Sequence, residues 1–368
     1  MRMMTDTTHA YEPAVARLCV PRADPANSFV LHAQLELMAR IGLLEYVSND
    51  VSCGALRRID ALADEYTVTG PAAPDPVESA FGSVVEAVEE LAAALNRADL
   101  DRVDAAVTWL AVRVSGSEAG PLLGEVVVAS LAAAGHAPIG LHLLNRVAQG
   151  VLPVALLRGP LRELARHPNW KLTWFRSMQT GGGDVAEALA AVPHLGRPGS
   201  DFIYPLMSQA ERVAPGLLGG VLDTEPDVAA HTLSRAAVWS MLNDDPSQAP
   251  YGWSHCLTMP QAVMSLAGRG VEARTAVAVA ATFVVGFRAA HGLLPLGPLD
   301  DATAAIRGRH EAPPVEQLAD FASLHHDAHL VKYTLACIHA ADDDPDWRPV
   351  YLHAAAFLAD WWRARVDG

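Results

Sequence analysis

Hydrophobic side chains recur every three or four residues along most of this chain, which is the period of an amphipathic helix. Segments with this period run at 29–42, 77–95, 100–114, 270–290 and 347–366. No stretch shows the strict alternation of a β-strand or the turn of a hairpin. The pattern therefore predicts an all-α fold.

We expect one large multi-helix domain over residues 25–368. The preceding residues 1–24 are polar and contain prolines, which predicts a flexible N-terminal arm. The chain has 368 residues, of which 51% are hydrophobic, so it is long enough to bury a sizeable core.

Two local motifs bear on helix boundaries and on nucleotide binding. Thr258 and Gln261 have the spacing of a capping box with Pro260 in the first turn, so a helix is predicted over 259–268. Residues 180–186 formally match the G-x-G-x-x-A dinucleotide fingerprint. No β-rich run precedes them, so we expect a loop followed by a helix cap.

Charge and cysteine content exclude several classes of partner. The formal net charge of −15 argues against binding to nucleic acid or to an anionic membrane, because both need a clustered basic surface. The four cysteines, which form no C-x-x-C pair, are typical of a reduced protein and not of a disulfide framework. The N-terminus lacks the apolar core of a signal peptide, and the longest apolar run, 276–287, is shorter than the roughly 20 residues that a membrane span needs and is predicted to be a buried helix. We expect a cytoplasmic protein.

The segment 325–332, His-His-Asp-Ala-His-Leu-Val-Lys, gathers nitrogen side chains. If it is helical, His325, His329 and Lys332 fall at positions i, i+4 and i+7 and share one face. A shared face can carry metal ligands. The alternative is a polar rim of histidines on an amphipathic helix.

Lys332 is unusual because only it and Lys171 are lysines among the 27 basic residues. It lies in the apolar segment 330–336. An arginine stays charged, whereas a buried lysine can lose its proton and then act as a nucleophile or be modified. The alternative is a lysine that pairs with a carboxylate or reaches out to water.

Further histidines fall inside apolar segments or near predicted helix starts: His32, His136, His142 and His255. Neutral imidazoles suit iron, zinc or copper, and helical bundles commonly take metal ligands from separate helices. A histidine-rich set without a cysteine pair argues against structural zinc. The H-E-x-x-H and G-x-S-x-G motifs of hydrolases are absent. A metal site between helices is therefore predicted.

At these residues the chain resembles a known family. Residues 327–332, Asp-Ala-His-Leu-Val-Lys, resemble the D-x-H-x-[IV]-K motif near the C-terminus of the questin oxidase-like family. Residues 135–139 are similar to its H-x-x-I helix start, and residues 253–258 to its third histidine segment. The resemblance spans about 32–339, most of the chain.

The resemblance implies an oxidoreductase, an iron-dependent oxygenase of secondary metabolism that oxidises or cleaves a polycyclic aromatic, anthraquinone-like polyketide. It implies Fe(II) with O2 and a metal site of four histidines and a lysine carboxylated at its ε-nitrogen: His32, His136, His255, His329 and Lys332. His142 and His325 are the reserve ligands. The family usually has an Asn-His pair further ahead of the closing glycine, whereas the only candidate here is His32, ten residues before Gly42.

Aromatic residues in the middle of the chain are expected to line a slot for the small aromatic substrate: Trp170, Trp174, Tyr251 and Trp253. Such residues are also common in cores. One alternative function is an NADPH-assisted Baeyer–Villiger-type oxidase, the older description of some family members. Another is a non-catalytic helical protein that binds a metabolite. The sequence leaves open whether the chain forms a homo-oligomer.

Overall fold

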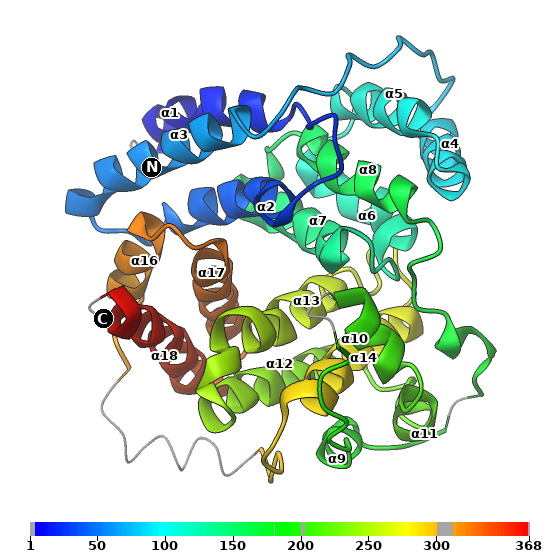
Figure 1. Ribbon diagram of the computed structural model, residues 1–368, viewed down its shortest axis with the longest axis vertical. Coiled ribbons are helices and arrows are strands. Elements are labelled where there is room, and N and C mark those ends of the chain that lie inside the picture. The colour runs from blue at the N-terminus through cyan, green and yellow to red at the C-terminus, as the bar shows by residue number, and fades with distance from the viewer. Residues whose placement is uncertain (1–3, 180, 200–202, 300–311, 367–368) are drawn as a thin grey trace. The chain divides into compact units, whose positions relative to one another are not determined.

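The computed structural model describes residues 4–179, 181–199, 203–299 and 312–366 (Figure 1). Within these ranges every extended regular element is a helix, and the only β pairing consists of isolated bridges. The prediction of an all-α fold is confirmed. Because helices satisfy their backbone groups internally, the fold depends on how their apolar faces pack.

The internal contacts group the chain into two compact units, Met1–Lys171 and Leu172–Gly368. The described residues of unit 1, 4–171, contain eight α-helices: α1 (Met4–Leu18), α2 (Ser28–Leu43), α3 (Asn49–Thr67), α4 (Val84–Arg97), α5 (Leu100–Ala111), α6 (Gly116–Val127), α7 (His136–Arg146) and α8 (Arg158–Arg166). In the described residues of unit 2 the α-helices are α9 (Val185–Ala190), α10 (Ile203–Ala210), α11 (Ala214–Leu218), α12 (Pro226–Asn243), α13 (Ser254–Met264), α14 (Ala273–His291), α16 (Val315–Leu324), α17 (Ala328–Asp343) and α18 (Arg348–Val366). A single domain over 25–368 stays a prediction.

The expected flexible arm at 1–24 is wrong for most of its length. Residues 4–18 form α1, which packs against α3 (Figure 1). Tyr11, Ala14 and Leu18 are buried there. The polar composition concealed an amphipathic period, and burial of one apolar face holds the helix in place.

Helices α2 and α7 pack against each other in the core of unit 1. The start of α2 is set by Asn27, whose side-chain oxygen accepts a hydrogen bond from the backbone N–H of Val30 at 2.9 Å. Nearly all of α2 is buried, including Glu36 and Arg40, which form an ion pair within the helix. The helix predicted at 29–42 is confirmed.

Left-handed turns flank both ends of α7. Positive φ angles occur at Ala133, Ala134, Gly135, Ala148, Gln149 and Gly150. A left-handed conformation costs a non-glycine residue about 1–2 kcal/mol, so the surrounding packing must hold these turns. They fix where α7 begins, and His136 is its first residue, as the sequence predicted.

Helix α14 forms the centre of unit 2 and packs against α10, α12 and α13 (Figure 1). Its residues from Ala276 to His291 are all buried, so the predicted buried helix is confirmed. By length and composition α14 is the one helix of the described residues that could cross a membrane, and 83% of its most apolar window is buried inside the structure. Length and apolar composition alone are weak evidence that a helix spans a membrane.

Several predicted helix boundaries are wrong. Helix α13 begins at Ser254, not at 259, and a π-helical turn, Ala249–Trp253, leads into it. The expected capping box is absent, because the Thr258 hydroxyl donates to the carbonyl of Ser254 inside the helix. The segment predicted at 77–95 becomes helical only at Val84, where Ser83 caps α4. Helix α3 was not predicted.

Candidate metal centre and aromatic pocket

Unit 1 brings two of the predicted ligands together. His32 lies on α2 and His136 at the start of α7, and the packing of these helices sets their ring centroids 4.5 Å apart in an edge-to-face arrangement. Both side chains are buried, with 8% and 0% of their surface exposed. Unit 1 therefore contains two neighbouring buried imidazoles, His32 and His136.

The tautomer of His32 follows from its local contact. Its Nδ1 lies 2.5 Å from the carbonyl oxygen of Ser28, one turn earlier on α2. Since a carbonyl can only accept, Nδ1 carries the proton and the lone pair for a metal lies on Nε2. This arrangement is typical of metal-binding histidines, whose other nitrogen donates to a carbonyl or carboxylate.

His142, a reserve ligand, is also buried in α7. It lies six residues after His136, which turns it about 120° away around an ideal helix axis. Helix geometry therefore favours His136, and the choice between the two can be tested directly.

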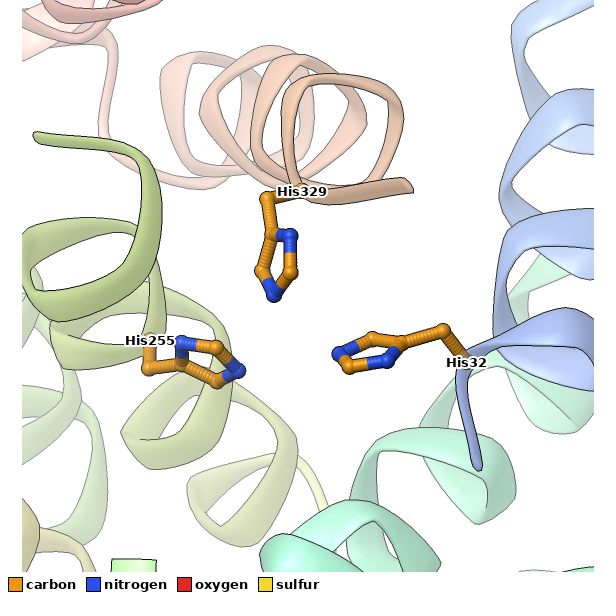
Figure 2. Close-up of side chains that lie close together, drawn as sticks. All are labelled: His32, His255 and His329. Carbon is orange, nitrogen blue, oxygen red and sulfur yellow. The ribbon is translucent and has the colours of Figure 1, made fainter. Parts of the chain in front are cut away.

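Unit 2 brings His255 and His329 together. Figure 2 shows His255 on α13 and His329 in the first turn of α17, with their rings turned toward one another. Their ring centroids are 4.9 Å apart, and one ligand nitrogen of each lies within 4.8 Å of the other. Both helices pack against each other, which fixes this distance.

His255 is held by the π-helical turn that precedes α13. Its Nδ1 lies 2.7 Å from the carbonyl oxygen of Tyr251, so Nδ1 is the donor and Nε2 holds the lone pair. The wider π-helical turn offers that carbonyl to the ring. Such turns occur frequently at functional sites.

His329 is held by Asp327, the N-cap of α17. The Asp327 carboxylate accepts hydrogen bonds from the backbone N–H groups of His329 and Leu330, at 2.9 and 3.0 Å. The same oxygen lies 3.6 Å from Nδ1 of His329. A carboxylate in this position favours the proton on Nδ1 and directs Nε2 toward a metal.

Lys332 lies one turn after His329 on α17 and is 5% exposed. Burial is the main cause that lowers the pKa of His255 and of His329, and a positive charge on Lys332 would lower both pKa values further. Burial disfavours a charged ammonium in general. The motif Asp327, His329 and Lys332 therefore gathers a cap, an imidazole and an amine in the first turns of one helix.

Both imidazoles of unit 2 are held neutral. Burial lowers the pKa of His255 well below its usual value, and a positive charge on His329 or Lys332 would lower it further. Burial also lowers the pKa of His329, although Asp327 opposes the shift. Neutral imidazole is the form that binds metal.

His325 does not share a face with His329 and Lys332, contrary to the helical pattern. It follows the last residue of α16, outside α17, and has an extended backbone. Its Nδ1 accepts the backbone N–H of Asp327 at 3.0 Å, and its ring stacks on His326 and packs against Trp362. The helix is interrupted because Asp327 acts as an N-cap, which requires a non-helical backbone.

A cavity of about 270 Å³ opens beside the histidine pair of unit 2. Its aromatic walls are Tyr251 and Phe287. The Tyr251 ring packs edge-on against His329 at 4.9 Å, and the Phe287 ring is stacked with His255 at 6.3 Å. The polar lining includes Arg197 and His291.

Of the four residues predicted to line an aromatic slot, only Tyr251 lines this cavity, and its role in binding a substrate stays a prediction. Trp253 is completely buried and packs against His291 as a core residue. Trp174 donates its indole N–H to the Thr282 hydroxyl at 3.0 Å and does not line the cavity. Trp170 belongs to unit 1, where it stacks on His167 with ring centroids 4.0 Å apart.

Sequence reasoning missed Phe287, His291 and Arg197. Phe287 and His291 are four residues apart at the end of α14, so the single histidine of this mostly apolar helix was a usable signal. No comparable signal marks Arg197, which lies in a loop rich in proline and glycine.

The donor set of unit 2 fits a transition metal. Two neutral imidazoles with Nε2 available by tautomer, and a lysine amine that carboxylation would convert into an oxygen donor, match the ligand types that iron accepts. Comparison of the chain with models of protein families, with curated proteins and with solved structures finds no match. The resemblance to the questin oxidase-like family stays a prediction from its motifs.

Proposed function

We propose that this protein is an iron-dependent oxygenase acting on a polycyclic aromatic compound. The observation that carries the proposal is the cluster of His255, His329 and Lys332 in unit 2, next to an aromatic cavity. Two histidines and one carboxylate on one side of the metal are the ligand set of many non-haem iron oxygenases. A carboxylated Lys332 would supply that carboxylate.

Carboxylation needs only CO2 and the neutral amine. The Nζ lone pair attacks the carbon of CO2, a nitrogen–carbon bond forms, and the amine releases one proton, which leaves an anionic carbamate. A guanidinium does not give up its proton at neutral pH, so arginine could not replace Lys332. The chain uses lysine at only one further position, Lys171.

Bound iron would supply activation of O2 toward an electron-rich ring. Residues of the protein would orient the metal ligands and hold the substrate. Asp327 and the Tyr251 carbonyl hold Nδ1 of the two histidines, which keeps both rings oriented. Phe287 and the Tyr251 ring would hold a flat substrate beside them.

His32 and His136 are proposed from the sequence resemblance as further ligands of the same iron. Their tight pairing in unit 1 and the Nε2 lone pair of His32 support a ligand role. Residues 181–183 are a loop and Asp184 caps the six-residue α9, as the sequence predicted for this segment, while Thr180 lies outside the described residues.

The test is metal analysis of the full-length protein after anaerobic loading with Fe(II). We expect stoichiometric iron in the wild type, loss of iron in His329→Ala and Lys332→Ala, and wild-type loading in Lys171→Ala, the matched control. Oxygen uptake with hydroxyanthraquinones should follow the iron. Absence of bound iron, or wild-type iron in Lys332→Ala, would overturn the proposal. Aromatic binding without iron would then favour the non-catalytic binding protein.

A further inference from the structure

The cavity of unit 2 has one polar wall whose hydrogen-bonding capacity the protein leaves unused. His291, the last residue of α14, lines the cavity and is only 7% exposed. Among the residues that the structure describes, none forms a hydrogen bond with its imidazole. Neither ring nitrogen is fully enclosed by those residues. Because buried polar groups are as a rule hydrogen-bonded, the partner must be water or a ligand in the cavity.

The neighbours of His291 hold its ring in place. The Phe287 ring is stacked with it, with centroids 6.4 Å apart and planes 22° apart, and the Trp253 ring packs edge-on at 6.0 Å. A Cβ atom added at Gly252 would lie 3.1 Å from Cδ2 and 3.4 Å from Nε2 of His291, so a side chain there would crowd the ring edge. A ring that is already held in place loses little conformational entropy when a ligand binds to it.

The imidazole of His291 offers one donor and one acceptor. Burial is the main cause that lowers the pKa of His291 to about 4, so the ring is neutral at physiological pH. A neutral imidazole carries a proton on one nitrogen and a lone pair on the other. In His255 the Tyr251 carbonyl fixes which nitrogen is protonated, whereas no described residue makes such a contact with His291. Its ring is therefore able to donate to a ligand or to accept from it.

A hydroxyl group matches such a ring better than a carbonyl does. A hydroxyl both donates and accepts, so it pairs with either tautomer, whereas a carbonyl only accepts. The aromatic walls of the cavity, Tyr251 and Phe287, suit a flat ring that carries this hydroxyl. Phe287 is stacked with His255 as well as with His291, so a ligand that lies along the Phe287 ring extends from His291 toward the histidine pair.

We propose that His291 is a specificity-determining residue, whose imidazole recognises an aryl hydroxyl group on a flat ligand in the cavity of unit 2. One hydrogen bond to His291 orients the ligand, while the rings of Tyr251 and Phe287 hold its apolar part. The inference rests on the proposed function and deepens it, since it assigns a recognised hydroxyl group, and a residue that binds it, to the substrate of that reaction.

The experiment compares 2-naphthol with naphthalene, which lacks the hydroxyl, by equilibrium dialysis of the full-length protein. His291→Phe keeps an aromatic ring and removes both nitrogens. It should weaken binding of 2-naphthol about fivefold, the effect of one neutral hydrogen bond, and leave naphthalene binding unchanged. His291→Gln keeps a donor and an acceptor, so it should bind 2-naphthol more tightly than His291→Phe does. His326→Phe changes an exposed histidine outside the cavity lining and is the matched control, which should bind both probes as the wild type does.

A second measurement uses the wild-type protein and does not depend on the folding of His291→Phe. Binding of 2-naphthol should fix one tautomer of His291 and so move its two imidazole 15N resonances apart, whereas naphthalene should not. The resonances are assigned by their absence in His291→Gln. The proposal is overturned if 2-naphthol leaves these resonances unchanged, which would show that only water satisfies the imidazole, or if His291→Phe weakens both probes equally or neither.

Both measurements are made on metal-free and on iron-loaded protein, which separates this inference from the proposed function. Recognition of the hydroxyl by His291 in a protein that binds no iron would support this inference and reject only the oxygenase. Iron binding without recognition of the hydroxyl would reject only the role of His291.

Discussion

One oxygen of Asp327 lies 3.6 Å from Nδ1 of His329 and 2.9 Å from its backbone nitrogen. The same carboxylate therefore begins α17 and orients the imidazole in the first turn of that helix. Burial alone would raise the pKa of Asp327, but the hydrogen bonds and charge of His329 lower it, so the carboxylate stays ionised. These two roles can be separated by mutation.

Asp327→Asn should keep the helix start and weaken metal binding. Asparagine caps helices as well as aspartate does, so the melting temperature should change little. Loss of the negative charge facing His329 should lower iron affinity roughly 10- to 100-fold, the effect typical of removing such a partner. Competition with a chelator measures the affinity. Asp327→Ala should in addition destabilise the fold by about 0.5–2 kcal/mol. Equal iron affinity in Asp327→Asn and the wild type would show that the carboxylate acts only as a cap.

The two lysines allow carboxylation to be assigned to a single residue. Protein equilibrated with 13C-labelled bicarbonate should give one carbamate resonance by NMR, because Lys332 is buried and proposed to be carboxylated, whereas Lys171 is half-buried and within 3.5 Å of the side chain of Asn96. The resonance should disappear in Lys332→Ala and persist in Lys171→Ala. A resonance that Lys171→Ala abolishes would reject the assignment.

His136 and His142 should differ in metal binding, although both are buried in α7. The His136 ring contacts the His32 ring, and His142 lies about 120° around the helix axis from His136, so His136→Ala should lose iron and His142→Ala should keep it. Both substitutions remove a buried ring and should lower the melting temperature, which makes each a stability control for the other. The reverse pattern of iron loss would identify His142 as the ligand.

Stability should fall as the pH is lowered through the range in which His291 titrates. Its pKa is lowered from 6.5 to about 4, chiefly by burial, so the unfolded chain binds the proton first as the pH falls. The stabilising contribution is complete above pH 6.5 and is lost progressively between about pH 6.5 and 4. His291→Gln should therefore show a shallower fall of melting temperature across this range than the wild type. His326→Gln, which changes an exposed histidine, should follow the wild type. Parallel curves for the wild type and His291→Gln would contradict the prediction.

Gly252→Ala should perturb the aromatic cavity. A Cβ atom at this position would lie 3.1 Å from Cδ2 of His291 and 3.3 Å from Cβ of Gln248, closer than ordinary contacts. We expect destabilisation of about 1–3 kcal/mol from overpacking, and weaker binding of a hydroxyanthraquinone used as the binding probe. Gly216→Ala is the matched control, because nothing lies within 4 Å of its added Cβ, and it should leave both quantities close to wild type. Unchanged probe binding in Gly252→Ala would separate this glycine from the cavity.

Helical periodicity was sufficient to predict the fold class and the places of His32 and His136. Both lie in strongly periodic, buried segments. The left-handed turn before α7 ends at Gly135, so that His136 is the first residue of the helix. Periodicity could not predict the break at Asp327, because the apolar spacing continues across it. An N-cap depends on one side chain and one backbone conformation, a local event that a pattern over many residues does not detect.

The aromatic cavity was the least predictable part. The presence of a tryptophan in the sequence does not indicate whether it lies in the core or lines a pocket. Trp253 is a core residue, although it is close in sequence to the half-exposed Tyr251. The cavity instead depends on how α14 packs against the π-helical turn, which places Phe287 and His291 opposite Tyr251. Such tertiary packing overrides local preference, and Arg197 reaches the cavity from a loop without periodicity.

The residue Tyr251 connects the cavity with the histidine pair through its own backbone. Its side chain lines the cavity, while its carbonyl oxygen accepts a hydrogen bond from Nδ1 of His255. A ligand that shifts this peptide group would therefore change how His255 is oriented, so, if His255 binds a metal as proposed, occupancy of the cavity and metal affinity would be thermodynamically coupled. By reciprocity, the factor by which an aromatic ligand alters the affinity for metal must equal the factor by which metal alters the affinity for that ligand.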